Sequence, residues 1–383
     1  MASRASPRRA LHCAPGTQWV FPSLVLAVLA LLSLGLQAGP GDAELKEAEP
    51  VPRLDLHGRL FLDLPGLDGE QGRPRSLRLQ ARLHLDEHAS ARVQLEHGRG
   101  ELEVFEASFT YRDEEWGEAR LGHHRPPAGS EARTSLSVLP SPERSAPVRA
   151  LLPSRATGLS YGTRTAEGWS LGAFGGARRA LDPIGSQRLV VGRRDWELEE
   201  ATATSRSHLG LWAMHWNGGA DGLRLDARPW GGSRARTVDS GDLVGARAVG
   251  AGLEWSHVRP DWILQNETIV QRIEGLAPEG VGSPWGSTVT LVLPRGGLQR
   301  SWSATRQALH HPDHVVPHRS HEWVLRASWL DLEPVGGSRQ TELAVGVNLY
   351  VSRRSRWMFH LQRTAIERAA DLDVLLLRIQ AGF

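Results

Sequence analysis

The sequence predicts an all-β fold, a transmembrane antiparallel β-barrel of about 16 strands. Three observations predict it: apolar residues recur at every second position, an apolar export segment lies near the N-terminus, and the last strand ends on an aromatic residue. Helical periodicity is not convincing in any part of the chain, and no later apolar run is long enough for a membrane helix. Because only helices and closed barrels satisfy their backbone in lipid, a membrane protein with this pattern has to be a barrel.

The N-terminal segment is typical of a secretory signal peptide. Three arginines precede an uncharged apolar core at 20–36, and small residues follow, with candidate cleavage sites after Ala38 and Ala43. The alternative is an uncleaved anchor, since the apolar core is nearly long enough to span a membrane. The small residues favour cleavage. We therefore predict a signal peptide at 1–38, a short periplasmic leader at 39–52 and the barrel at 53–383.

The composition excludes several classes of function. The whole chain of 383 residues has a formal charge of +2, and losing the three arginines of 1–38 brings it to −1, so the charge does not indicate nucleic-acid binding. The only cysteine, Cys13, lies in the predicted signal peptide. We therefore predict no disulfide, no thiolate metal site and no cofactor.

In the first part of the barrel region, apolar and polar residues alternate from residue 53. A period of two places alternate side chains on opposite faces of a strand. The apolar rows lie within 54–64, 77–85, 93–95 and 107–111, and the positions between them carry mostly Arg, Asp, Glu, His and Gln. An apolar row facing lipid and a polar row facing a lumen is typical of an outer-membrane barrel.

The same alternation continues to the end of the chain, with more interruptions in the middle. Further apolar rows lie within 169–173, 210–216, 223–227, 249–255, 323–329, 343–351 and 357–361. Glycine-rich turn signals separate them, and aromatic residues gather near strand ends, as an interfacial girdle requires. A soluble two-domain sandwich is the alternative, but no linker divides the chain.

The size of the barrel follows from chain length. Roughly 340 mature residues, at about 20 per strand and turn, allow on the order of 16 strands, which enclose water instead of a packed core. The polar rows are then pore wall. The arginines on them are candidate lumen-wall residues: Arg78, Arg82, Arg224, Arg228 and Arg378.

The terminal strand has the clearest alternation. Leu375, Leu377, Ile379 and Ala381 share one parity, and the chain ends on Phe383 with the same parity. On its own this strand also fits the end of a soluble β-domain. With the signal peptide and the other rows, it predicts the closing strand of an outer-membrane barrel. We interpret Phe383 as the signal by which the barrel-assembly machinery recognises the chain for insertion.

Residues 117–162 contain an ordered set of motifs. These are Gly122, Arg125-Pro126, Gly129, Glu131, Thr134-Ser135, Glu143-Arg144-Ser145, Pro153, Arg155 and Gly158. In order and spacing they resemble the phosphate-selective porin O and P family. Phe174-Gly175 and the C-terminal section, with 346–350 and 378–383, resemble later parts of the same family, so the likeness spans most of the mature chain.

The resemblance implies a homotrimeric barrel of 16 antiparallel strands in the bacterial outer membrane. It implies passive diffusion of small anions, with phosphate or polyphosphate preferred, through a lumen lined by arginine and narrowed by an inward-folded loop. The chain departs from the family at His124-Arg125, where a Phe-Lys pair is common, and it is short for the family. Both differences bear on anion selectivity more than on the barrel.

Arginines of the motif segment are the candidate constriction residues. A guanidinium is permanently charged and donates hydrogen bonds in a fork, which suits anion passage. The candidates are Arg125, Arg133, Arg144, Arg149 and Arg155. The alternative is that several of them pair with Glu131 and Glu143 or face outward in a turn.

Two other signals are weaker. Residues 168–172 match the Gly-x-Ser-x-Gly pattern of hydrolases, but they lie in an alternating strand where that chemistry needs a strand, a turn and a helix. Five histidines lie at His310, His311, His314, His318 and His321. Their spacing fits no closed metal site and two prolines imply an irregular loop, so we predict a solvated loop, with metal binding as the alternative.

The sequence thus predicts a passive outer-membrane porin without catalytic residues, in contact with outer-membrane lipid and with small anions. Two rival functions stay open at this point. A barrel enzyme would need a convergent Ser/His or carboxylate set at the barrel mouth. A plugged structural or receptor barrel would show bulky or apolar residues along the polar rows, and these rows are mostly charged.

Overall fold

The computed structural model describes residues 52–64, 73–98, 101–163, 165, 167–175, 185–198, 205–230, 236–276, 280–300, 302–303 and 308–383. The predicted signal peptide and all but the last residue of the predicted leader lie outside these ranges. Among the described residues, no helix has the length and apolar character needed to cross a membrane.

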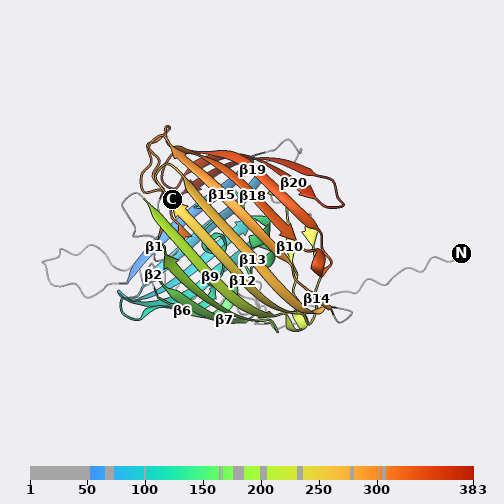
Figure 1. Ribbon diagram of the computed structural model, residues 1–383. Helices are drawn as coiled ribbons and strands as arrows, with labels where there is room; N and C mark the ends of the chain where they lie inside the picture. The colour runs from blue at the N-terminus through green and yellow to red at the C-terminus, as the bar shows by residue number, and fades with distance from the viewer. Residues whose placement is uncertain are drawn as a thin grey trace.

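Most described residues belong to one closed antiparallel sheet (Figure 1). Its first half consists of β1 (Arg53–Leu64), β2 (Arg73–His84), β3 (Ala89–Gly98), β4 (Glu101–Asp113), β5 (Gly117–His124), β6 (Ala156–Gly162), β7 (Trp169–Gly175) and β8 (Arg188–Glu197). Its second half consists of β9 (Arg206–Asn217), β12 (Arg247–Val258), β13 (Ile263–Leu276), β14 (Gly280–Gly282), β15 (Trp285–Arg295), β18 (His321–Asp331), β19 (Arg339–Tyr350), β20 (Arg356–Ile366) and β21 (Leu372–Gly382).

Short elements lie in the connections between these strands. They are the helices α2 (Ser130–Arg133) and α3 (Ala146–Leu151), the 3-10 turns η1 (Gly219–Asp221) and η3 (Glu333–Val335), and two small hairpins. The hairpins pair β10 (Asp226–Ala227) with β11 (Val238–Asp239) and β16 (Trp302–Ser303) with β17 (Ala308–Leu309). Figure 1 shows the helices enclosed by the wall of tilted strands.

The sheet closes because the first strand pairs with the last. β1 pairs with β2 on one side and with β21 on the other. Gly58 and Phe383 exchange two backbone hydrogen bonds of 2.8 and 3.0 Å, which completes the seam. β14 and β15 both pair with β13 and form one interrupted span, so the described strands make a barrel of 16 spans, as predicted.

Most of the predicted rows face the predicted way. In β2, Leu79 is 48% exposed on the outer face, whereas Arg78 is 7% exposed on the inner face. The rows of β12, β18, β19 and β20 also point their leucines, valines and tryptophans outward. The row at 210–216 is different, because Trp212 and Met214 are buried and face the interior.

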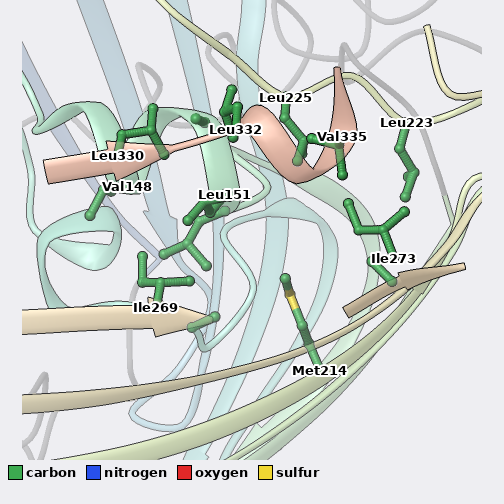
Figure 2. Packing of buried hydrophobic residues seen from close by; sticks show 14 of the residues in the cluster. Val148, Leu151, Met214, Leu223, Leu225, Ile269, Ile273, Leu330, Leu332 and Val335 are labelled. Atoms are coloured by element: carbon green, nitrogen blue, oxygen red, sulfur yellow. The ribbon is translucent and has the colours of Figure 1, made fainter. Parts of the chain in front are cut away.

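The interior is not water alone, which corrects the sequence-based expectation. A large cluster of buried apolar side chains lies inside the wall (Figure 2). It joins Val148 and Leu151 of α3 to inward residues of the wall such as Ile269, Ile273 and Leu330. Apolar side chains therefore occupy inner positions of β9, β12, β13 and β18, where the pattern predicted only pore wall.

The apolar row at 223–227 was wrongly predicted to be a barrel strand, because it lies in the connection 218–246 between β9 and β12. Leu223, Leu225 and Ala227 alternate with polar residues, but they lie in this connection and are buried in the interior cluster. The insert contacts α3 through β10. Arg224 and Arg228 are therefore not on a barrel strand, and their assignment to the lumen wall was wrong.

The two ends of the barrel differ in their connections. At the end where β1 begins and β21 stops, most connections are short, such as 85–88, 114–116 and 259–262. Outer-membrane barrels have short turns on the periplasmic side and longer loops outside. One connection at this end is long: residues 296–320, which carry the histidine-rich stretch.

Candidate functional site

Residues 125–155 connect β5 to β6 by passing through the inside of the barrel. Glycines allow the chain to leave the wall, because Gly122 and Gly129 have φ of 119° and 73°. At residue 129 a Cβ would lie 2.4 Å from a methyl group of Leu152. We call residues 125–155 the inner segment; it corresponds to the inward-folded loop that the sequence predicted.

Hydrogen bonds from the wall strands hold the inner segment against one side of the lumen. Each uses an inward polar side chain to satisfy a backbone carbonyl that would otherwise be buried without a partner. The donors and acceptors are Arg356 to Leu139 (2.5 Å), Asn348 to Pro140 (2.8 Å), Arg378 to Pro142 (2.6 Å), Arg326 to Glu143 (2.8 Å) and Gln271 to Leu151 (2.5 Å). All five donors lie on strands between β13 and β21.

Ion pairs complete this attachment. Arg378 Nε lies 2.6 Å from Asp63, and its Nη2 lies 3.0 Å from Glu143 of the inner segment. Arg149 pairs with Glu342 at 3.3 Å. Glu267 accepts hydrogen bonds from the backbone N–H of Glu131 (3.0 Å) and the hydroxyl of Ser130. This side of the interior is therefore packed and hydrogen-bonded.

The opposite side of the interior is hollow. A cavity of about 930 Å³ lies between the inner segment and the inner faces of β1 to β7. Its described lining includes ten arginines but only three acidic side chains, Glu106, Glu118 and Asp313. Such a surplus of permanent positive charge in a confined, partly desolvated space attracts anions and excludes cations.

Phe105 organises the arginines in the middle of this wall. The register between β3 and β4 shifts here, since Gln94 pairs with Glu106 and Leu95 with Val104, so Phe105 is the extra residue of a bulge. The guanidinium carbons of Arg78 and Arg155 lie 3.5 and 3.7 Å from the centre of its ring. The ring thus fixes two guanidiniums by cation–π contact.

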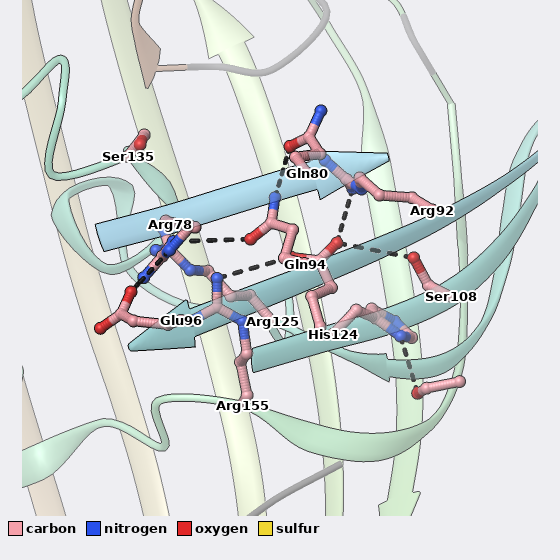
Figure 3. Close-up of polar contacts among 12 residues, drawn as sticks. Arg78, Gln80, Arg92, Gln94, Glu96, Ser108, His124, Arg125, Ser135 and Arg155 are labelled. Atoms are coloured by element: carbon pink, nitrogen blue, oxygen red, sulfur yellow. Dashed lines mark hydrogen bonds and ion pairs between the residues drawn. The ribbon is translucent and has the colours of Figure 1, made fainter. Parts of the chain in front are cut away.

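Glutamates also hold arginines of this wall in place (Figure 3). Arg78 Nε donates to Glu96 at 2.6 Å, and Arg92 lies 2.7 Å from Glu106. Figure 3 shows these side chains on three neighbouring strands, all pointing into the same space. The arginines are therefore held in fixed positions on the wall.

Three of the five predicted constriction arginines line the cavity: Arg125, Arg133 and Arg155. Arg125 donates to the carbonyls of Ala132 (2.7 Å) and Thr134 (2.8 Å), so it also fixes the fold of the inner segment. Burial, together with the neighbouring guanidiniums, lowers the pKa of Arg125 below its ordinary value. Burial and the charge of Arg193 lower the pKa of Arg133 to about 10.

The other two candidates, Arg144 and Arg149, are not in the described lining. Arg144 donates to the carbonyls of Glu131, Ala132 and Thr134, and Arg149 pairs with Glu342. The alternative was that several motif arginines pair with Glu131 and Glu143. Arg149 and Arg155 do pair with carboxylates, but the partners are Glu342 of β19 and Glu106 of β4.

The predicted lumen-wall arginines divide in a similar way. Arg78 and Arg82 line the cavity. Arg378 faces inward as predicted, but it is buried under the inner segment. Arg224 pairs with Asp239 at 2.5 Å and with Asp242 at 3.0 Å in the 218–246 insert, and Arg228 lies 3.5 Å from Asp226.

Five lining arginines were missed as site residues: Arg59, Arg92, Arg112, Arg120 and Arg354. The polar parity of β1 and β3 already pointed Arg59 and Arg92 into the lumen, so this signal could have found them. Arg112 and Arg120 flank the turn after β4, and the strand register places them on the same face. Arg354 lies in the turn after β19, where no periodicity applies.

The long connection 296–320 borders the cavity. Trp302, Leu309, His310 and His311 are among its lining residues. Leu309 packs with Val138 at the tip of the inner segment. Burial and the charge of His310 lower the pKa of His311 to about 3, so its imidazole is neutral near pH 7. The described residues contain no group of histidines and acids that could hold a metal ion.

The C-terminal residue lies at the same end of the cavity as the connection 296–320. Phe383 continues the outward row of β21, its ring lies against Gly58, and it borders the cavity mouth. The stretch 168–172 runs into strand β7 without a helix, as the alternation predicted, so it does not form a nucleophile elbow.

Comparisons with known proteins agree with this architecture. A sequence model of the family described as phosphate-selective porin O and P matches residues 66–280. No significant match was found among curated proteins.

Several solved structures share the fold. A loop-deletion mutant of OmpT, an outer membrane protein of Vibrio cholerae, superposes with a TM-score of 0.56 at 9% identity, over 87% of this chain and 99% of that one. OprB of Pseudomonas putida gives a TM-score of 0.53 at 11% identity, over 87% and 94% of the two chains. An anion-selective porin from Comamonas acidovorans gives 0.51 at 12% identity, over 87% and 100%.

Proposed function

The chain belongs to the phosphate-selective porin O and P family, and from this premise we propose that its arginine-lined cavity is the path by which small anions diffuse across the outer membrane. The observation that carries the proposal is the charge of the cavity lining, with ten arginines and three acidic side chains among its described residues. The name of the family and the anion-selective porin with a similar fold support the same conclusion.

The geometry gives the proposal a physical basis. The inner segment fills one side of the lumen, so an ion that crosses the barrel travels between this segment and the opposite wall, past Arg78 of the wall and past Arg125 and Arg155 of the inner segment. Guanidiniums keep their charge at any physiological pH and offer several N–H donors to an anion that has lost part of its hydration shell. A cation on the same path meets the same charges as a barrier.

Phosphate is the substrate that the family membership favours. Its oxygens accept forked hydrogen bonds from guanidiniums, and arginine recognises phosphate well for that reason. The contacts that would separate phosphate from other oxyanions are not determined by the charge surplus alone. We therefore propose small oxyanions as the substrate class, with phosphate as the first to test.

The remaining parts of the proposal concern assembly and export. A trimeric form of OmpT has a similar fold, and this supports a homotrimer here. The basic and apolar start of the sequence supports export with a cleavable signal peptide, and Phe383 at the closing seam supports its role as insertion signal. Such a barrel contacts outer-membrane lipid through its exposed apolar rows.

We also propose that the protein is not an enzyme. One Ser/His pair does line the cavity: His124 Nε2 lies 2.8 Å from Ser160 Oγ, and His124 Nδ1 lies 3.0 Å from the carbonyl of Gly122. The described partners of this imidazole are thus a hydroxyl and a backbone carbonyl, without the carboxylate of a catalytic triad. We expect no labelling of Ser160 by a fluorophosphonate probe, and stoichiometric labelling would contradict the proposal.

The main test is electrical. Purified protein is placed in a planar lipid bilayer across a potassium chloride gradient, and the reversal potential is measured. We expect a potential close to the chloride equilibrium value and a chloride current that phosphate blocks saturably. A potential on the potassium side would contradict the anion path, and a bilayer without conductance would contradict diffusion through the lumen.

A further inference from the structure

Three glutamates on the wall of β3 to β5 each lie between two arginines. The groups are Arg59–Glu96–Arg78 (3.7 and 2.6 Å), Arg92–Glu106–Arg155 (2.7 and 3.4 Å) and Arg112–Glu118–Arg120 (2.7 and 2.8 Å). We call them the Arg–Glu–Arg groups. Each group combines two guanidiniums with one carboxylate and therefore keeps a net positive charge.

The three groups lie at successive levels of the barrel. Glu118 pairs with Arg112 next to the turn at the end where the chain terminates. Glu106 is several residues further along β4, and Glu96 pairs with Glu103 further still. An anion moving along this wall would meet the groups in that order.

Within each group the glutamate uses the same donors that an anion would use. A carboxylate accepts hydrogen bonds from guanidinium N–H groups just as an oxyanion does. An anion that binds a group has to share or replace these contacts. Conduction requires binding that is favourable enough for entry and weak enough for exit.

We propose that the Arg–Glu–Arg groups are successive binding positions for the permeating oxyanion and that Glu106 is the residue that limits how tightly it is held. This inference rests on the proposed function, because it describes the same path. Glu106 is 4% exposed, and it faces the cavity. Its carboxylate contacts Arg155, whose guanidinium is fixed on the ring of Phe105.

The other two groups lack one of these features. Glu118 is only partly buried, so water screens its competition with an anion. Glu96 contacts Arg78 but is not part of the described cavity lining. Glu106 alone combines burial, contact with the path and an arginine that cannot move away with an incoming anion.

The test compares Glu106→Gln with the wild-type protein in planar bilayers. The amide keeps the shape of the side chain but gives up the charge, so the arginines become stronger anion donors. We expect phosphate to block half of the chloride current at a concentration about three- to tenfold lower than in wild type. We also expect a reversal potential closer to the chloride equilibrium value.

Two further variants make the result specific. Glu87→Gln removes the same charge from an exposed side chain in the turn after β2, and it should leave phosphate block unchanged. Glu106→Asp keeps the charge with a shorter reach and should give an intermediate block. Circular dichroism and trimer mobility on gels check that each variant folds.

The outcomes separate this inference from the proposed function. A wild-type protein that selects cations overturns both. An anion-selective wild type with unchanged block in Glu106→Gln overturns only the role of Glu106. Weaker block by phosphate in Glu106→Gln, with Glu106→Asp like wild type, would show that the carboxylate supports anion binding, and it would equally overturn the inference.

Discussion

Two sides of the same barrel face very different interiors. Along β1 to β6, inward arginines such as Arg78 and Arg92 border a cavity, whereas along β13 to β21 inward arginines such as Arg326 and Arg378 are buried beneath the inner segment. Both sides have polar residues on the inner face and an apolar outer row, although the packed side also carries inward apolar residues such as Ile269 and Leu330. A polar inner row therefore indicates which face of a strand is inside, but not whether water or protein lies opposite it.

The inward arginines of the two sides differ in the groups to which they donate hydrogen bonds. Arg356 and Arg378 satisfy backbone carbonyls of the inner segment and carboxylates of the wall, so their charge is used within the protein. The cavity arginines outnumber the carboxylates that they contact. The cavity arginines therefore produce a net positive electrostatic potential along the path of an ion, whereas the buried arginines do not. This contrast leads to four predictions, which begin with the largest expected effect.

Removing Arg378 should break the packed side. Arg378→Ala removes one of the two guanidiniums that contact the buried carboxylates of Asp63 and Glu143, the other being that of Arg75, and it removes the donor to Pro142. We expect a loss of about 3–5 kcal/mol in the free energy of unfolding, measured by urea titration in detergent. Arg363→Ala removes an exposed arginine from the next strand and should cost under about 1 kcal/mol. Equal losses would contradict the contrast.

A cavity introduced into the buried apolar cluster should destabilise the packed side of the barrel without changing any charged residue. Leu151 of α3 is fully buried, and Leu151→Ala should cost about 2–5 kcal/mol of unfolding free energy. The matched variant Leu121→Ala truncates a leucine that is 58% exposed on the outer face. If both variants unfold at the same urea concentration, the interior cluster does not stabilise the barrel as described here.

Charge removal should change selectivity only on the cavity side. Arg155→Gln should lower the ratio of chloride to potassium permeability by about threefold, because it removes a permanent positive charge from the cavity lining. Arg149→Gln makes the same change in the packed side, where the side chain pairs with Glu342. We expect Arg149→Gln to alter stability and not selectivity. If Arg149→Gln changed the permeability ratio in bilayers and Arg155→Gln did not, ions would pass along the side that is described here as packed.

The smallest effect concerns pH and the connection 296–320. In the folded chain the pKa of His311 is about 3, because burial and the charges of His310, Arg356, Arg300 and Arg354 disfavour the imidazolium. In the unfolded chain it is about 6.5. The unfolded state thus binds the extra proton between these values, and stability falls as the pH drops from about 6.5 towards 3.

His311→Gln removes this dependence. Its thermal midpoint should fall less than that of wild type between pH 7 and pH 4, while the chloride selectivity of the two proteins should agree above pH 5. An identical pH dependence of the midpoints would show that His311 is not shielded in this connection.

The sequence predicted the barrel well for a simple physical reason. Each strand repeats one pattern, and lipid outside forces the apolar parity outward at Leu79 as at Leu375. The closing strand and the inward-folded segment were also predicted correctly, the first from periodicity and the second from the family motifs.

The lining of the site was predicted only in part. Arg78, Arg82, Arg125, Arg133 and Arg155 line the cavity, and their roles in the constriction or the lumen wall stay predictions. Arg144 and Arg149 were indistinguishable from these in sequence, because the folding of the inner segment decides their partners. Arg144 donates to carbonyls within the motif segment, and Arg149 pairs with the distant Glu342. The insert at 218–246 was misread because Leu223, Leu225 and Ala227 alternate just as a strand does, although they pack into the interior.

Cysteine accessibility tests the contrast between the two sides most directly. The only cysteine of the chain, Cys13, lies in the predicted signal peptide, so a single introduced cysteine reports on one position. Gln80 lines the cavity, whereas Gln340 faces inward from β19, donates to Glu342 and is 1% exposed. Each is changed to cysteine, and the reaction with a water-soluble methanethiosulfonate reagent is followed through the bilayer current.

We predict rapid modification of the Gln80→Cys protein with a change in anion current, and no modification of the folded Gln340→Cys protein. Equal reaction of both positions would mean that the lumen is open on both sides. That result would contradict the account of a barrel in which one side is packed and the other conducts.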